Sequence, residues 1–126
     1  MWGSVPPRDP VLLIEDNDGL REALARLLEA RGYQVVRARD GQEGWEYLVG
    51  GGCACVIVLD ILMPRLDGRL FRTKQLEREQ CASIPVVVFT ASGEGVPDAV
   101  AVIRKTDPQA LLDTIDRAAS IPALQD

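Results

Sequence analysis

Residues 56–59 form an uninterrupted apolar run, Val-Ile-Val-Leu, which ends abruptly at Asp60. A strand without polar alternation is typical of a sheet that is covered on both faces, as parallel sheets are. Open parallel sheets place their chemistry at the carboxyl ends of strands, where Asp60 would stand. The alternative is that Asp60 only caps the following loop, because Asp is common in turns. The run therefore predicts a buried parallel strand and leaves the role of its terminal carboxylate open.

Similar short apolar runs recur along the chain, with helical patterns between them. The predicted strands are residues 11–14, 33–38, 53–59, 84–89 and 100–103. The predicted helices are residues 19–31, the segment from Asp40 to the glycines at 50–52, residues 69–79, and a last helix that starts at Asp107-Pro108. Mixed polarity places residues 33–38 near a sheet edge. Strands that alternate with helices predict an α/β fold with a doubly wound five-stranded parallel sheet.

The helical pattern of residues 69–79 predicts which side chains face the core. Leu70, Phe71 and Leu76 are expected to point inward, with the charged residues on the outer face. The cysteines, Cys53, Cys55 and Cys81, are expected to be reduced core residues and not a metal pair, since Cys53 and Cys55 would share one face of a strand.

Length and composition limit the classes of protein to consider. The 126 residues suffice for one domain, which we place at 11–119, between a Pro- and Gly-rich lead or linker at 1–10 and a tail at 120–126. No apolar run approaches the roughly 18 residues of a membrane span, and no secretory leader pattern is present. We therefore expect a cytoplasmic protein without membrane contact. A net charge of −5 and dispersed basic residues argue against direct nucleic-acid binding.

The sequence contains no histidine. This excludes Ser-His and Cys-His nucleophilic pairs and histidine metal ligands within the chain. A bound metal would be held by oxygen, which favours Mg²⁺, Ca²⁺ or Mn²⁺.

Polar side chains stand at the carboxyl ends of the predicted strands, which share one edge of a parallel sheet. They are Glu15, Asp16, Asp60, Thr90 and Lys105. Neighbouring carboxylates repel one another unless a cation or a proton relieves them, and Mg²⁺ is the natural occupant. A Lys and a Thr opposite them suit a phosphoryl group, as a point charge and a hydroxyl donor. Singly, each residue is explained as a loop cap or a surface charge; together they predict a metal and phosphoryl site with a carboxylate nucleophile.

These residues give the chain a resemblance to the receiver domains of two-component response regulators, over about Val11 to Ala119. The motifs that carry it are Glu15-Asp16, LDILMPRLDG around Asp60, Phe89-Thr90-Ala91 and Lys105. The resemblance implies a flavodoxin-like sheet with strand order 2-1-3-4-5. It also implies a signal relay in which Asp60 accepts a phosphoryl group from a phosphohistidine of a histidine kinase or a histidine phosphotransfer protein.

The same resemblance assigns the remaining site residues. Asp16, Asp60 and the backbone carbonyl of Leu62 would hold Mg²⁺, with Mn²⁺ as an alternative, and Glu15 would act mostly through water. Thr90 and Lys105 would each bind a phosphoryl oxygen.

Three features depart from the family pattern. Only residues 91–99 separate the fourth and fifth strands, whereas a crossover with its helix takes about 10–12 residues or more. We therefore predict that the fourth helix is missing or reduced to a turn. Val102 occupies the switch position, which is usually aromatic, so an aromatic rotamer switch cannot operate. Thr106 replaces the usual proline after Lys105, and a cis bond to a non-proline costs about 2.5–4 kcal/mol, so we expect a trans bond there.

Two alternatives belong to other functional classes. One is a degenerate receiver that acts as a phosphorylation-independent interaction module. The other is a phosphatase with an Asp nucleophile, which would need a second Asp where Leu62 stands. We expect no enzyme beyond catalysis of its own phosphorylation and dephosphorylation, a monomer or weak homodimer, and an output partner that the sequence does not identify.

Overall fold

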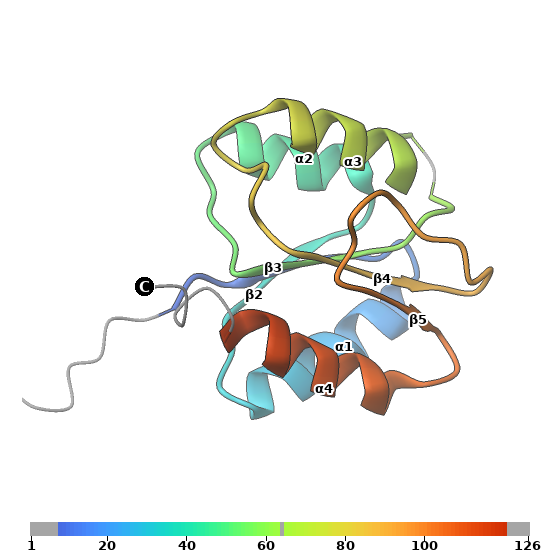
Figure 1. Ribbon diagram of the computed structural model, residues 1–126. Coiled ribbons are helices and arrows are strands. Elements are labelled where there is room, and N and C mark those ends of the chain that lie inside the picture. Colours follow the sequence, from blue (N-terminus) through green and yellow to red (C-terminus); the bar gives the residue numbers. More distant parts are fainter. Residues whose placement is uncertain (1–7, 64, 121–126) are drawn as a thin grey trace, which may run out of the picture.

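A computed structural model describes residues 8–63 and 65–120 (Figure 1). Parallel strands form one five-stranded sheet in the order β2-β1-β3-β4-β5. Helices α1 and α4 cover one face of this sheet, and α2 and α3 cover the other (Figure 1). The predicted doubly wound α/β fold and its strand order are therefore confirmed. The predicted lead at 1–10 and tail at 120–126 lie mostly outside the described residues.

The elements lie within a few residues of the predicted ones. The strands are β1 Val11–Ile14, β2 Val35–Ala38, β3 Val56–Leu59, β4 Val86–Thr90 and β5 Ala101–Arg104. The helices are α1 Asp18–Ala30, α2 Gly41–Val49, α3 Gly68–Glu77 and α4 Pro108–Ser120. Strand β2, with its mixed polarity, lies at an edge of the sheet as expected. None of the described helices combines the length and apolarity needed to cross a bilayer.

Side-chain caps fix the start of each helix. Asn17, Asp40, Asp67 and Asp107 each accept a hydrogen bond from a backbone N–H of the first helical turn. Such caps satisfy donors that have no partner within the helix. Each helix therefore begins at a defined residue.

Two apolar layers enclose the sheet. The central strands β1, β3 and β4 are buried at every position, as the unbroken apolar runs predict. On the side of α1 and α4, Leu24 and Leu111 belong to one layer. On the side of α2 and α3, Leu48 and Phe71 belong to the other. Because both faces are packed, the strand ends form a rigid edge on which polar residues can be held.

Helix α3 is turned differently from the prediction. Leu70 is 49% exposed and Leu76 is 39% exposed, so the expectation that these two leucines point inward is wrong. Phe71 is buried as expected, and Arg72 and Gln75 are buried beside it. Neighbouring helix positions differ by about 100°, so Phe71 and Leu70 cannot both face the core centre. The buried face of α3 is therefore partly polar.

The segment between β4 and β5 contains no helix. Residues 91–100, all of which the structure describes, form neither helix nor strand, which confirms the predicted loss of the fourth helix. The helix labelled α4, Pro108–Ser120, is consequently the last helix. Val96 and Ala99 pack against the apolar layer on the α3 side, and Val100 N–H donates to Val86 O at 2.8 Å. A short loop thus packs against the sheet in place of the fourth helix that the sequence predicts to be missing.

Arg72 fastens this loop to α3. Its Nε donates to Pro97 O at 2.9 Å and its Nη2 to Asp98 O at 3.2 Å. Its Nη1 donates to Gln75 Oε1 at 2.8 Å. Burial lowers the pKa of the Arg72 guanidinium, partly offset by nearby Asp98. The prediction that charges of this helix face outward is therefore wrong for Arg72, because the loop offers it carbonyl oxygens instead of water.

Two smaller expectations concern the Lys105–Thr106 peptide bond and the cysteines. The described residues contain no cis peptide bond, so the Lys105–Thr106 bond is trans as predicted. All three cysteines are free, but only Cys81 is buried, whereas Cys55 is half-buried and Cys53 is exposed. The prediction of core cysteines is therefore right for Cys81 and wrong for Cys53, which precedes β3 instead of lying within it.

Candidate functional site

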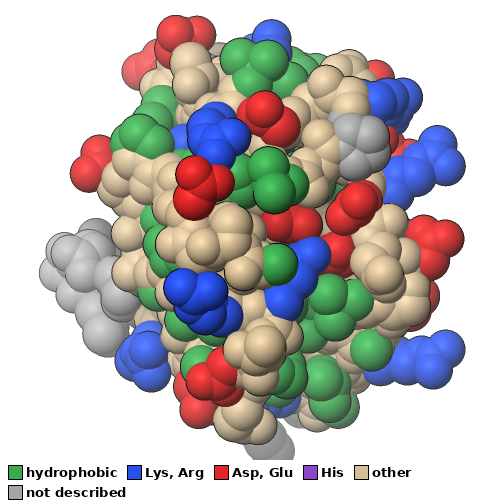
Figure 2. Space-filling model, turned by 90° about the vertical axis from the view of Figure 1, so that its right-hand side faces the viewer, with side chains coloured by type: hydrophobic (Ala, Val, Ile, Leu, Met, Phe, Trp, Pro, Cys, Tyr) green, Lys and Arg blue, Asp and Glu red, His purple; other side chains and the backbone are tan. Residues whose placement is uncertain are grey.

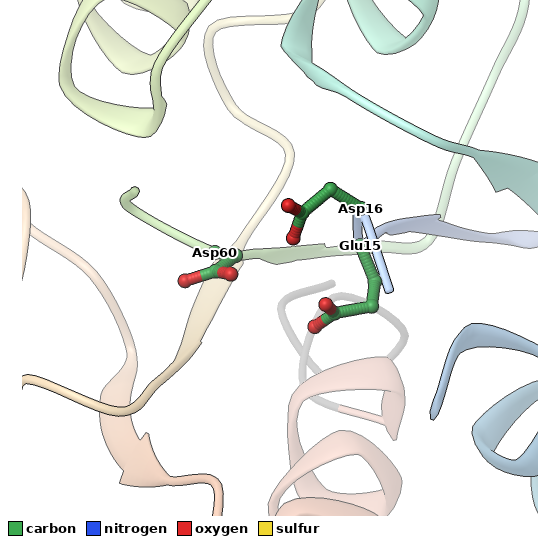
Figure 3. Close-up of side chains that lie close together, drawn as sticks. All are labelled: Glu15, Asp16 and Asp60. Carbon is green, nitrogen blue, oxygen red and sulfur yellow. The ribbon is translucent and has the colours of Figure 1, made fainter. Parts of the chain in front are cut away.

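Three carboxylates converge where β1 and β3 end. Glu15 and Asp16 follow β1 directly, and Asp60 follows β3. Oxygen atoms of the three groups lie within 4.8 Å of one another (Figure 3). Glu15 and Asp60 are buried, whereas Asp16 is exposed. Two carboxylates of the cluster are therefore shielded from solvent, and the third is accessible to it.

Lys105 reaches this cluster from the far side of β4. It follows β5 directly, and its Nζ lies 2.8 Å from Asp60 Oδ2 and 3.0 Å from Glu15 Oε1. Burial disfavours its charged form, but the hydrogen bonds that it donates to Asp60 and Glu15 outweigh this and raise the pKa of the ammonium. Lys105 thus supplies a fixed positive charge between two buried acids.

Glu15 is held in place by its own surroundings. Its Oε2 accepts the Asn17 N–H at 3.0 Å, and its backbone carbonyl accepts Arg21 Nη1 at 3.0 Å. Burial raises the pKa of the Glu15 carboxyl, against the opposing influence of Asn17 and Lys105. The sequence does not predict the contact of Arg21 with Glu15 O, because an arginine on a helix surface gives no signal of such a contact.

The Asp60 carboxylate has a partner on each oxygen. Oδ1 accepts the Ile61 N–H at 2.7 Å, while Oδ2 contacts Lys105. The loop after Asp60 folds back so closely that a Cβ on Gly68 would lie 2.4 Å from Asp60 O. Only glycine fits there without a shift, because real Cβ atoms do not approach a carbonyl oxygen so closely. The start of α3 therefore fixes the backbone of Asp60.

Thr90 is the last residue of β4, which lies between β3 and β5 in the sheet. Its side chain is buried, and its Oγ1 lies 3.3 Å from Ser92 Oγ and accepts the Ser92 N–H at 3.4 Å. Lys105 N–H donates to Thr90 O at 3.1 Å, which ties the ends of β4 and β5 together. Thr90 thus lies at the same edge as the acids, with its hydroxyl engaged by the following loop.

The donor set fits a hard divalent cation. Carboxylate oxygens gathered at one edge, with an open side for water, are what Mg²⁺ takes in proteins. The structure brings Glu15, Asp16 and Asp60 together as the sequence predicts. Leu62 lies in the loop after β3 with its side chain 61% exposed, and the metal role of its carbonyl stays a prediction.

Comparison with known proteins identifies the family and the fold. The profile of the response regulator receiver domain matches residues 11–118. The chain belongs to this receiver domain family. Transcriptional regulatory protein SrrA of Staphylococcus aureus is 33% identical over 84 residues, which cover 67% of this chain and 33% of that protein. This receiver domain therefore spans about a third of the length of the curated relatives that it matches.

Solved receiver domains have the same architecture. The signal receiver domain of a signal transduction histidine kinase from Syntrophus aciditrophicus superposes with a TM-score of 0.82 at 25% identity, covering 94% of this chain and 95% of that one. The N-terminal domain of a response regulator/sensory box/GGDEF 3-domain protein from Carboxydothermus hydrogenoformans gives 0.76 at 27% identity, covering 91% and 97%. The fold assignment thus rests on sequence and on structure.

Val102, which the sequence predicts to occupy the switch position, lies outside the acidic cluster. Val102 is 41% exposed on β5, and a Cβ on Gly95 would lie 2.7 Å from its Cγ2. The loop after β4 therefore runs close over Val102. Figure 2 shows the face that lies at the right of Figure 1, where acidic and basic side chains lie close together among hydrophobic and uncharged ones.

Proposed function

We propose that this receiver domain accepts a phosphoryl group from a phosphohistidine onto Asp60 and relays a signal through protein–protein contacts. The donor in this proposal is a histidine kinase or a histidine phosphotransfer protein. The observation that carries it is the Asp60 carboxylate, which is buried, bonded to Lys105 at 2.8 Å, and adjacent to Glu15 and Asp16. A carboxylate is an adequate nucleophile when it is fixed in position and its charge is balanced.

The proposed step is an in-line transfer. An Asp60 oxygen attacks phosphorus, the P–N bond to the donor imidazole breaks, and the imidazole leaves with the electron pair of that bond. Lys105, already next to Asp60, pairs with a phosphoryl oxygen. Thr90, whose Oγ1 lies 3.3 Å from Ser92 Oγ, donates its hydroxyl hydrogen bond to another phosphoryl oxygen. The protein thus contributes position and charge, which dominate catalysis of phosphoryl transfer.

The proposal includes dependence on Mg²⁺, with Mn²⁺ as an alternative. Asp16, Asp60 and the carbonyl of Leu62 would hold the ion, and Glu15 would act mostly through water. The ion supplies positive charge that offsets repulsion between the carboxylates and the incoming phosphoryl group. The close carboxylates of the cluster support this, because without a cation or proton they repel one another.

Turnover of external substrates is not part of the proposal. A phosphatase of the Asp-nucleophile class needs a second Asp as general acid, and Leu62 stands at that position. We propose that the domain catalyses only its own phosphorylation and dephosphorylation. We also propose a location in the cytoplasm. We propose no direct nucleic-acid contact, because the net charge is −5 and the basic residues are dispersed.

The alternative function is a degenerate receiver that binds its partner regardless of phosphorylation. The absence of a helix within residues 91–100 and the aliphatic Val102 favour it, since both alter the usual signalling face. The complete set of acids, Thr90 and Lys105 favours phosphorylation, because an interaction module needs none of them.

Phosphorylation by acetyl phosphate separates the two functions. With Mg²⁺, we expect intact-mass spectrometry to find one added phosphoryl group that hydroxylamine removes, and we expect EDTA to prevent its addition. Asp60→Asn should abolish the adduct. Asp67→Asn is the matched control in the same loop, because Asn also caps α3 well. An unmodified wild-type protein, or an adduct that persists in Asp60→Asn, would contradict the proposal.

A further inference from the structure

A run of hydrogen bonds leads from the edge of the site to the surface of α3. Thr90 Oγ1 lies 3.3 Å from Ser92 Oγ, and Ser92 Oγ accepts the Glu94 N–H at 3.2 Å. The Glu94 carboxylate then accepts Arg69 Nη2 at 2.6 Å. Arg69 lies in the first turn of α3, one residue after Gly68. These contacts connect Thr90, the proposed phosphoryl-binding residue, to α3 through the short β4–β5 loop, with Glu94 taking part through its backbone N–H and its carboxylate.

We propose that Thr90, Ser92 and Glu94 form a hydrogen-bonded chain that transmits the binding of a phosphoryl group at the acidic cluster to Arg69 on α3. This inference rests on the proposed function, because the proposed occupant is a phosphoryl group on Asp60. It assigns the reporting role to α3, in place of the helix that the β4–β5 segment lacks.

The Thr90 hydroxyl is the element with two states. It carries a single proton, and either hydroxyl of the Thr90–Ser92 pair can donate when no phosphoryl group is bound. When Thr90 donates its hydrogen bond to a phosphoryl oxygen, only Ser92 can donate within the pair. All bonds then run in one direction, from the Glu94 N–H through Ser92 and Thr90 to the anion. Aligned hydrogen bonds polarise one another and strengthen, so the bonds of the chain become stronger when the phosphoryl group is bound.

The second half of the β4–β5 loop is anchored to α3, whereas the first half contacts α3 through an exposed ion pair. Arg72 is buried and holds Pro97 O and Asp98 O, which anchors the second half of the loop to α3. The Arg69–Glu94 pair is about half exposed, at 50% and 54%. Exposed ion pairs contribute only about 0–1 kcal/mol, so this contact is easily made and broken. Its strength therefore suits a reporter of state better than a structural anchor.

The backbone near Glu94 permits such a movement. Gly93 has a φ of 80°, in the left-handed region that favours glycine. Gly95 follows Glu94 and lies against Val102 without a side chain between them. The two glycines leave the backbone on either side of Glu94 less restricted than other residues would.

Nuclear magnetic resonance with a phosphoryl mimic tests the chain. Beryllium trifluoride and Mg²⁺ are added to the wild-type domain, and three signals are followed: the Ile61 amide beside Asp60, the Glu94 amide, and the Arg69 side-chain N–H. We expect all three to shift, with the Glu94 amide proton moving downfield and exchanging more slowly with solvent.

Variants isolate each link. In Ser92→Ala, the Ile61 response should persist while the Glu94 and Arg69 responses are lost, and Ser92→Thr should restore them. In Glu94→Gln, the Glu94 amide should still respond while the Arg69 response falls. Glu77→Gln, an exposed acid on the same helix, is the matched control and should leave all three responses intact.

The outcomes distinguish this inference from the function beneath it. An Arg69 response that persists in Ser92→Ala, or that is absent from a wild-type domain whose Ile61 amide responds, would overturn the chain and leave phosphorylation standing. A wild-type domain whose Ile61 amide does not respond would remove the proposed function and the chain with it.

Discussion

Lys105 Nζ lies 2.8 Å from Asp60 Oδ2, although the two residues follow strands that are separated by β4. The lysine also contacts Glu15, so a single ammonium balances two buried carboxylates. This relationship makes Lys105 both a charge for the proposed phosphoryl group and a structural counter-ion. Its two roles can be separated by experiment.

Substitution of Lys105 by Met is expected to destabilise the fold and weaken phosphorylation. Loss of one partner of a buried pair costs about 3–5 kcal/mol, and partial exposure of the lysine reduces this to roughly 1–2 kcal/mol. Urea unfolding in EDTA measures the loss. Added Mg²⁺ should recover more stability in the variant than in the wild type, because the cation replaces the missing charge. Equal recovery in both proteins would contradict this account.

The Asp40–Arg65 pair predicts a pH-dependent difference in stability. The Arg65 guanidinium, bonded to Asp40 at 2.7 Å, holds the pKa of the buried carboxyl below its usual value, against the opposing effect of burial. A lowered folded-state pKa stabilises the protein above the unfolded pKa, and this stability is lost as pH falls through the folded pKa. Arg65→Gln should therefore lower the unfolding midpoint at pH 7.

The same pair supplies its own control. The difference in unfolding midpoint between Arg65→Gln and the wild type should shrink as the pH is lowered below the ordinary Asp range, where Asp40 becomes protonated. Arg39→Gln changes a neighbouring exposed arginine, whose bond is to Glu43, and should show a smaller effect at pH 7. A difference that stays constant from pH 7 into the acid range would argue against the Asp40 mechanism.

Arg72→Met is expected to loosen the β4–β5 loop. The variant leaves Pro97 O, Asp98 O and Gln75 Oε1 without their donor. Pro97 and Asp98 are exposed, so water can replace the lost donor there, whereas an unsatisfied buried group such as the Gln75 amide costs roughly 1–3 kcal/mol. We expect a loss of about 1–3 kcal/mol in urea unfolding and faster amide exchange at Val100. Arg72→Lys should not rescue it, because one ammonium cannot reproduce the planar fork. Lys74→Met, on the same helix, should be close to neutral.

The lifetime of the proposed aspartyl phosphate depends on Leu62. An apolar side chain two residues after Asp60 cannot orient an attacking water, so hydrolysis should not be unusually fast. Loss of the adduct over time, followed by mass spectrometry, measures this. Leu62→Asn should shorten the lifetime or leave it unchanged. A half-life of seconds in the wild type that lengthens in Leu62→Asn would count against the hypothesis.

Much of the fold follows from local patterns. Unbroken apolar runs such as residues 56–59 predict buried parallel strands, and the caps at Asp40 and Asp107 predict where helices begin. The acidic cluster follows as well, since parallel strands bring their carboxyl ends to one edge. The length of residues 91–99 alone predicts the missing helix, because chain length limits a crossover whatever its sequence.

Tertiary contacts explain what the pattern missed. Periodicity counts Arg72 as polar and turns it outward, but the Pro97 and Asp98 carbonyl oxygens lie across from it in a distant segment. The orientation of α3 follows from that contact, so Leu70 faces solvent. The link from Ser92 to Glu94 likewise depends on how a loop folds, which no repeat in the sequence encodes.

Val96 and Ala99 of the β4–β5 loop pack against the apolar layer beside β4, and Arg72 holds this loop through the Pro97 carbonyl oxygen. Strand β4 is buried at every position, whereas Val100 and Val102 next to it are 46% and 41% exposed. The segment 91–100 therefore closes the core over β4 without a helix, and it leaves an apolar side chain of the edge strand β5 accessible to solvent.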